Sequence, residues 1–336
     1  MRGQSNPISK ETKQARIGID LLGSDTDPDV LFHAVLAFAK DLDPALSLIL
    51  FGTEELFLKV TPPERTSFVK VPEVITMDDD PLSAIRQKKN SSLSQGILML
   101  QRKEIDAFVS AGNTGALIAM SILSLSMLPG IDRPALLTLL PTKSREMAVL
   151  DVGANTTFKT DHIFQFAQMG IAFQKTRGKV APTVGLLNIG SEEKKGTPEH
   201  REAYQKLQLL NIESTVFVGN IEGRDVFQGN IDVLVTDGFT GNVFLKTSEG
   251  TSAFILDELQ KRLPANLPSA FTDCFQKLRT KLHYAEYPGA LLCGVDGIVM
   301  KCHGDSTPQS LIHSIQGAKA LVQNSFLEKI KSQLMG

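Results

Sequence analysis

The sequence predicts an α/β protein whose sheet is mostly parallel and carries helices on both faces. Two observations lead to this prediction. Short apolar runs rich in Val, Ile and Leu alternate with longer segments whose apolar residues recur every three or four positions. In addition, the chain has 336 residues, 42% of them hydrophobic, which is enough to bury a sizeable core. Near-continuous alternation of strand and helix is typical of parallel sheets.

The first half of the chain supplies four expected strands, at residues 16–20, 46–52, 68–71 and 106–109. A helix is expected at 28–40, where Pro28 suits the first turn, and further helices at 92–103 and 116–128. The acidic residues 78–80 are followed by Pro81 and a basic stretch. This pattern is more typical of a capped helix start than of a cation site.

The second half supplies five more expected strands, at 134–140, 147–152, 183–188, 216–220 and 231–236. Helices are expected at 160–174, after Pro198, at 243–262 and at 269–283. Pro264 and Pro268 separate the last two, so we expect a helical hairpin at about 247–283. Residues 1–15 are polar and are expected to be a disordered extension, with residues 16–332 forming a single catalytic α/β domain.

Composition and absent motifs exclude several classes of protein. A formal net charge of −2 argues against a nucleic-acid partner. The three cysteines form no C-x-x-C pair, and the N-terminal segment has no apolar signal core, so we expect a cytoplasmic protein with reduced thiols. The spacing of the six histidines gives no zinc motif, and the dinucleotide, P-loop and serine-hydrolase fingerprints are missing. We therefore expect no metal and no cofactor.

The turns that follow the predicted strands indicate the chemistry of this protein. Residues 237–243 (Asp-Gly-Phe-Thr-Gly-Asn-Val) follow a buried strand and lead directly into a helix. Small residues at such a turn let an anion approach the backbone, and the first N–H groups of the helix point at that anion. Several other strands end in similar runs of Gly, Asn, Asp, Ser and Thr, which favours a cleft that handles phosphate.

Five motifs occur in order along the chain. They are residues 110–116 (Ser-Ala-Gly-Asn-Thr-Gly-Ala), 132–135 (Asp-Arg-Pro-Ala), 150–155 (Leu-Asp-Val-Gly-Ala-Asn), 220–225 (Asn-Ile-Glu-Gly-Arg-Asp) and 237–243. Together, over residues 17–330, they resemble the bacterial phosphate acyltransferases of phospholipid synthesis. The resemblance implies a fold like the phosphotransacetylases and isocitrate dehydrogenases and a homodimer. It also implies transfer of a long-chain acyl group from acyl carrier protein to inorganic phosphate.

The same resemblance implies how the product is used and where. The acyl phosphate would pass to a downstream membrane acyltransferase, and some members of the family associate peripherally with the membrane, here the inner face of the plasma membrane. The chain departs from the family pattern at Ser24 and Asp27 in the first strand end, and at Asp305, which adds a negative charge beside an expected anion site. In the lysine loop, residues 190–196, it keeps Glu192 and Lys195.

By this resemblance, the catalytic candidates are Lys195, Asn242 and Asn113. Phosphate or substrate is expected to be bound by further residues of the same turns: Asp25, Thr114, Gly115, Asn155, Arg224, Asp237, Thr240, Gly241 and His303. Phosphate is itself the nucleophile, so the reaction requires positioning and oxyanion donors rather than a Ser-His-Asp triad.

Each candidate also has a structural interpretation. Lys195 either neutralises phosphate or is a solvated loop lysine. Asn113, Thr114, Thr240 and Asn242 stand at helix starts, where they either donate to the substrate or cap the helix.

Three further candidates have the same two interpretations. Asp237 either orients a catalytic residue or stabilises its own turn. Arg224 either binds phosphate or pairs with its acidic neighbours. His303 either polarises the thioester carbonyl or is structural.

Two other functions remain open from the sequence: a short-chain phosphotransacetylase that uses acyl-coenzyme A, and a non-catalytic anion-binding regulatory module. The expected helix at 269–283 has Phe271, Phe275, Leu278 and Leu282 on one stripe. This stripe either packs on the core or a second subunit, or touches anionic lipid or receives the acyl chain.

Overall fold

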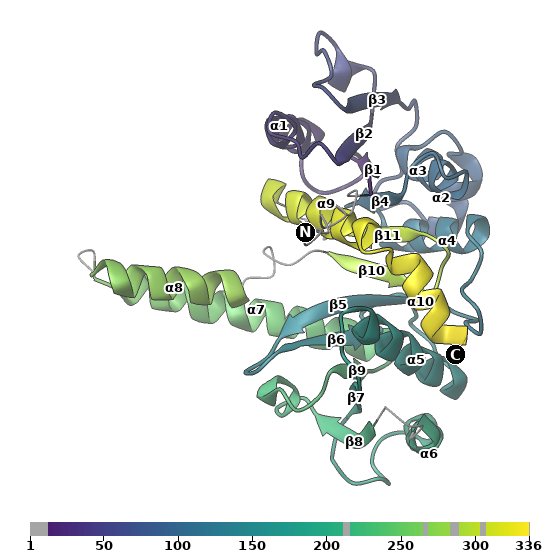
Figure 1. Cartoon of the computed structure of the whole chain (residues 1–336), viewed down its shortest axis with the longest axis vertical. Coiled ribbons are helices and arrows are strands. Elements are labelled where there is room, and N and C mark those ends of the chain that lie inside the picture. The colour runs from purple at the N-terminus through teal and green to yellow at the C-terminus, as the bar shows by residue number, and fades with distance from the viewer. Residues whose placement is uncertain (1–12, 211–215, 265–267, 283–288, 303–306, 336) are drawn as a thin grey trace, which may run out of the picture.

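The computed structural model describes residues 13–210, 216–264, 268–282, 289–302 and 307–335. Within these residues the chain forms one sheet of eleven strands flanked by helices (Figure 1). Most of the extension expected at 1–15 lies outside the described residues, and the first strand begins at Ala15.

One half of the sheet is parallel throughout. It contains β1 (Ala15–Asp20), β2 (Leu46–Gly52), β3 (Thr66–Lys70), β4 (Ala107–Ser110) and β11 (Ile298–Lys301), in the order β3-β2-β1-β4-β11. Ile17 and Ile19 on β1 are fully buried, as expected for a strand covered by helices on both faces.

The other half is a second parallel group that runs the opposite way. It contains β6 (Glu146–Leu150), β9 (Val233–Val235), β7 (Thr183–Asn188) and β8 (Val216–Glu222). Two strands join the halves: β10 (Ala290–Cys293) is antiparallel to β11, and β5 (Ala135–Pro141) is antiparallel to both β10 and β6. Three antiparallel steps therefore separate two parallel groups of opposite direction.

Helices cover both faces of this sheet. One face carries α1 (Pro28–Ala39), α5 (Thr160–Thr176), α6 (Pro198–Leu207), α9 (Pro308–Gln323) and α10 (Phe326–Met335). The other face carries α2 (Pro81–Gln87), α3 (Ser92–Gln101) and α4 (Thr114–Ser124), together with the start of a longer helix, α7 (Gly238–Arg262). The prediction of a mostly parallel α/β sheet with helices on both faces is confirmed.

Local capping explains where the helices begin. The Asp80 side chain accepts from the backbone N–H of Ser83 and starts α2, so the interpretation of 78–81 as a capped helix start is confirmed. α4 begins at Thr114 and α7 at Gly238, two and five residues before the starts expected from apolar periodicity. In both cases the residue before the helix supplies a side-chain cap that overrides the pattern.

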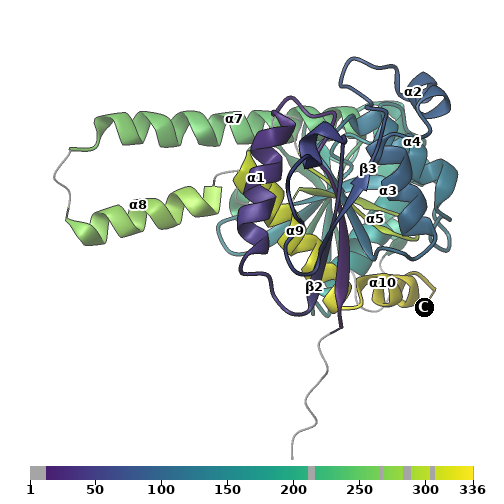
Figure 2. The ribbon, with the colours of Figure 1, turned by 90° about the horizontal axis from the view of Figure 1, so that it is seen from above.

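α7 and α8 (Ser269–Leu282) leave the body side by side and form a two-helix arm, which Figure 2 shows in profile. None of the residues of α8 is buried, and the arm exposes Phe254, Ile255, Leu259, Phe271 and Leu278. The interpretation of the α8 stripe as packed on the core is therefore wrong. The remaining interpretations are contact with a second subunit, contact with lipid, and a role in receiving the acyl chain.

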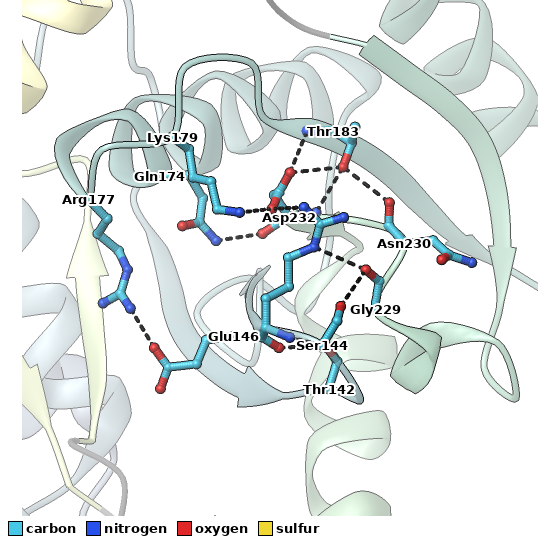
Figure 3. A network of polar contacts seen from close by, with 11 residues as sticks. Thr142, Ser144, Glu146, Gln174, Arg177, Lys179, Thr183, Gly229, Asn230 and Asp232 are labelled. Carbon is cyan, nitrogen blue, oxygen red and sulfur yellow. Dashed lines mark hydrogen bonds and ion pairs between the residues drawn. The ribbon is translucent and has the colours of Figure 1, made fainter.

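At the N-terminal ends of β7 and β9, a buried carboxylate holds several segments together (Figure 3). Asp232 pairs with Arg145 at 3.0 Å and with Lys179 at 3.1 Å, and it accepts from the hydroxyl and the backbone N–H of Thr183. Burial raises the pKa of the Asp232 carboxyl, but these donors outweigh it and hold the pKa below its usual value. This network, the Asp232 network, closes that end of the second parallel group.

Candidate functional site

A cavity of about 1010 Å³ lies along β5, between the C-terminal ends of β4 and β11 on one side and of β6 and β9 on the other. Its polar end is lined by Thr114 from α4, Gly153 after β6, Asn242 from α7, and Lys301 from β11. The rest, the apolar body, combines large apolar side chains with several Ser and Thr and with Lys143, Lys246, Glu249 and Lys281. There it is lined by Leu139, Pro141, Phe227, Phe244, Leu278 and Leu282.

The α4 end of the cavity is built by Asn113. Its Oδ1 accepts from the backbone N–H of Ala116 at 3.0 Å and caps the helix, while its Nδ2 donates to the carbonyls of Thr76, Met77 and Asp79. These contacts occupy the side chain, which is 6% exposed. Thr114, the next residue, lines the cavity.

Two glycines shape the α7 end, Gly241 through close packing and Gly153 through its positive φ. Asp237 accepts from the backbone N–H of Thr240 at 2.9 Å and caps α7. A Cβ on Gly241 would lie 1.8 Å from the backbone oxygen of Asp151, so only glycine lets the helix approach β6 this closely. Gly153 has a φ of +136°, and a Cβ there would lie 3.6 Å from Asn242, which is exposed towards the cavity. The first turn of α7 therefore presents Asn242 to the cavity.

A buried carboxylate, Asp151, shapes the turn that carries Gly153. Its two oxygens accept from the backbone N–H groups of Leu136, Gly153, Ala154 and Asn155, and from the Asn155 side chain. Asn155 also donates to the carbonyl of Pro134, so its amide group is used in the structure. Burial raises the pKa of Asp151, although the donors around it oppose this shift.

Lys301 is a residue of the polar end that the sequence did not single out. It is 7% exposed, and its Nζ donates to the carbonyls of Ala111, at 3.3 Å, and Cys302. Within the described residues the structure gives it no ion pair. Burial lowers the pKa of Lys301 to about 8; the charge of Lys246 acts in the same direction, whereas Cys302, Asp20 and Asp25 oppose the shift.

Asp20 lies two strands away from Lys301 in the same row of the sheet, since both residues are in register with Ser110 of β4. Asp20 accepts from the Ser110 hydroxyl at 2.8 Å and from the backbone N–H of Leu22 at 3.0 Å. Burial raises the pKa of the Asp20 carboxyl. Three neighbouring strand ends thus place an acid, a hydroxyl and a cation in one line.

Several predicted site residues lie away from the described lining of the cavity. Lys195, on the loop after β7, is half-exposed and lies 3.9 Å from Glu192. Arg224, after β8, is exposed and pairs with Glu222 and Asp225, the structural interpretation of this residue. Both follow strands of the outer part of the second parallel group.

The other candidates have mixed positions. Asp25 is exposed and acts electrostatically on Lys301, whereas Gly115 packs against Pro81. Thr240 supplies its backbone N–H to the α7 cap. His303 and Asp305 lie outside the described residues.

Comparison with known proteins decides the family. The family model described as "Fatty acid synthesis protein" matches residues 15–329. A phosphate acyltransferase of Chlamydia pneumoniae is 39% identical over 333 residues, covering 96% of this chain and all of that protein. A phosphate acyltransferase of Caldicellulosiruptor saccharolyticus is 40% identical over 330 residues, covering 95% of this chain and 98% of that protein.

The chain belongs to the fatty acid synthesis protein family. The resemblance drawn from the five motifs is confirmed, and so is the prediction of an acyltransferase. Of the site residues predicted from the sequence of this family member, Thr114 and Asn242 line the cavity, at its α4 and α7 ends. Lys301 was not predicted, because the sequence shows there only a lysine at the end of an apolar strand.

Solved structures show the fold of this family member independently. A phosphotransacetylase from Streptococcus pyogenes superposes with a TM-score of 0.60 at 14% identity, covering 91% of this chain and 94% of that one. At this identity the likeness shows the fold alone. Among the helices in the described ranges, none is both long and apolar enough to cross a bilayer.

Proposed function

We propose that this protein transfers a long-chain fatty acyl group from acyl carrier protein to inorganic phosphate and releases acyl phosphate for phospholipid synthesis. One observation carries the proposal: the cavity joins a polar end, where helices α4 and α7 begin, to a part lined by several large apolar side chains. Phosphate suits the polar end, because helix N-termini and small residues favour anions. An acyl chain suits the apolar body, because each buried methylene contributes about 0.8 kcal/mol.

The reaction follows from holding both substrates in this cavity. A phosphate oxygen attacks the thioester carbonyl carbon, the C–S bond breaks, and the thiolate of the carrier leaves and takes up a proton. Positioning of two reactants supplies about 7–11 kcal/mol in well-aligned cases. Donors at the polar end, among them Asn242, stabilise the oxyanion that develops on the carbonyl oxygen.

Incubation with palmitoyl-acyl carrier protein and phosphate, followed by mass spectrometry, tests the proposal. We expect acyl phosphate only when both substrates are present. Parallel reactions with palmitoyl- and acetyl-coenzyme A separate the alternatives. Faster turnover of acetyl-coenzyme A would indicate a short-chain phosphotransacetylase, and no phosphate-dependent loss of any thioester would indicate an anion-binding module.

The arm suits a second copy of this chain. It exposes Phe254, Ile255 and Leu259 on α7 alongside Phe271 and Leu278 on α8, and an apolar surface of this kind is typical of interfaces. We expect a dimer in solution that Phe254→Asp weakens, measured by analytical ultracentrifugation. Lipid is the other candidate partner. Flotation of Phe271→Asp and wild type with anionic liposomes decides this point, since unchanged binding would exclude a lipid role for that residue.

A further inference from the structure

We propose that Lys301 is a catalytic residue whose ammonium group contacts the phosphate acceptor at the polar end of the cavity. This inference rests on the function proposed above, because it places one of the two substrates of that reaction. The residue lies outside the motifs that carry the resemblance, and only the folded chain brings it to the cavity.

The surroundings of Lys301 argue for an anion. A buried charge is normally paired, because removing it from water costs several kcal/mol. The described partners of its Nζ are two neutral carbonyls, of Ala111 and Cys302. An anion bound next to this buried ammonium group would compensate its charge.

A second lysine strengthens this argument. Lys246 on α7 lines the same cavity and raises the electrostatic cost of a charge on Lys301. Two cations that repel each other across a cavity both gain when a phosphate binds between them. Lys246 itself lies 3.6 Å from Glu249, which keeps part of its charge compensated.

The position of Lys301 suits the chemistry. It ends β11, beside the β4 end from which α4 begins, so Thr114 and Lys301 line the same polar end. Lysine acts as a compact point charge on phosphate and leaves the attacking oxygen free to approach the carbonyl carbon.

The charge state of Lys301 makes the proposal sensitive to pH. Among the other described groups, Cys302, Asp20 on β1 and Asp25 on the following loop raise the pKa of Lys301, and Lys246 lowers it. The remaining charged residues of the cavity lining are Lys143, Glu249 and Lys281. Burial raises the pKa of the Cys302 thiol, so that group stays neutral near pH 8. Loss of the proton from Lys301 above about pH 8 should therefore weaken phosphate binding.

Calorimetric titration of inorganic phosphate into the full-length wild type, Lys301→Met and Lys301→Arg tests this inference. We expect the Kd for phosphate to rise ~10–100-fold in Lys301→Met, as expected for loss of a charged contact. Wild-type Kd should rise between pH 8 and 9.5, while Lys301→Arg, which stays charged, should bind equally at both pH values. Lys319→Met is the matched control, because that lysine pairs with Asp43 away from the cavity.

Kinetics on the same proteins distinguish the two proposals. With palmitoyl-acyl carrier protein, Lys301→Met should raise the KM for phosphate and leave the KM for the donor unchanged. Unchanged phosphate Kd in Lys301→Met, or a wild-type Kd that is flat from pH 8 to 9.5, would overturn the role of Lys301. Phosphate binding that depends on Lys301 without any acyl phosphate formed would support the site and overturn the proposed function.

Discussion

Two buried charges at different places in this sheet are treated in opposite ways. Asp232 has two cations and the two donors of Thr183 around it, and its pKa stays below the usual value. Lys301 donates to two neutral carbonyls, and its pKa falls to about 8. The Asp232 network is complete within the chain, whereas the surroundings of Lys301 favour an additional anion. Buried charges that a fold leaves unbalanced are therefore the ones that point to function.

Substitutions at the polar end of the cavity should give the largest effects on activity. We expect Asn242→Ala to lower kcat about 10²–10³-fold, as for loss of an oxyanion donor, with the fold intact because the side chain is exposed. Steady-state formation of acyl phosphate measures this effect, and circular dichroism checks the fold.

Lys195 tests how far the site extends beyond the cavity. We expect Lys195→Ala to lower phosphate-dependent turnover by orders of magnitude, with Lys194→Ala as the neighbouring control. Near-normal rates in Lys195→Ala would assign this lysine the solvated role that its half-exposed position also fits.

The Asp232 network should show the reverse pattern. Asp232→Ala leaves Arg145 and Lys179 without their shared carboxylate, so we expect a loss of about 3 kcal/mol in the free energy of unfolding. Urea denaturation measures the loss. The kcat per folded molecule should stay unchanged; a drop in kcat would show that the network also positions the site.

The pH dependence of stability should reveal the cost of the Lys301 charge. Its pKa is about 8 in the folded chain and 10.5 for an ordinary lysine, so between these values the unfolded chain binds more protons. Wild-type stability relative to Lys301→Met should therefore rise with pH in this window, by at most about 1.4 kcal/mol per pH unit. Urea denaturation of both proteins at pH 7, 8, 9 and 10 measures this, and a constant difference would contradict it.

The apolar body of the cavity should give the smallest effect. Leu139→Trp adds bulk to this lining, so we expect shorter acyl chains to be preferred. The ratio of kcat/KM for palmitoyl over octanoyl donors should fall about tenfold, in the range of a few methylenes in an apolar pocket. Leu58→Trp, at an exposed position outside the cavity, is the control.

Local sequence predicted most of the elements, because the apolar periodicity and the capping residues are encoded within a few positions. The apolar runs at 183–188 and 231–236 predicted β7 and β9, whereas the cap formed by Asp237 starts α7 five residues before the position that apolar periodicity predicted. The strand β10 was not expected, since four residues carry little pattern.

The direction of each strand and the proximity of the loops could not be predicted from the sequence, because both depend on pairing between distant segments. Nothing near residues 135–141 shows that β5 is antiparallel to both its neighbours, and this pairing reverses the second group. For the same reason the sequence could not show that the turn carrying Lys195 lies outside the cavity lining that includes Thr114 and Asn242. Lys301 reaches the cavity through the pairing of β11 with β4, between residues almost 200 positions apart.

α7 connects two distant parts of the molecule. It is a single helix of 25 residues, about 37 Å long, with Asn242 in its first turn and its last turns in the arm. Gly241 lets the first turn of α7 pack directly against the backbone of Asp151. One continuous helix thus connects the exposed arm with the polar end of the cavity.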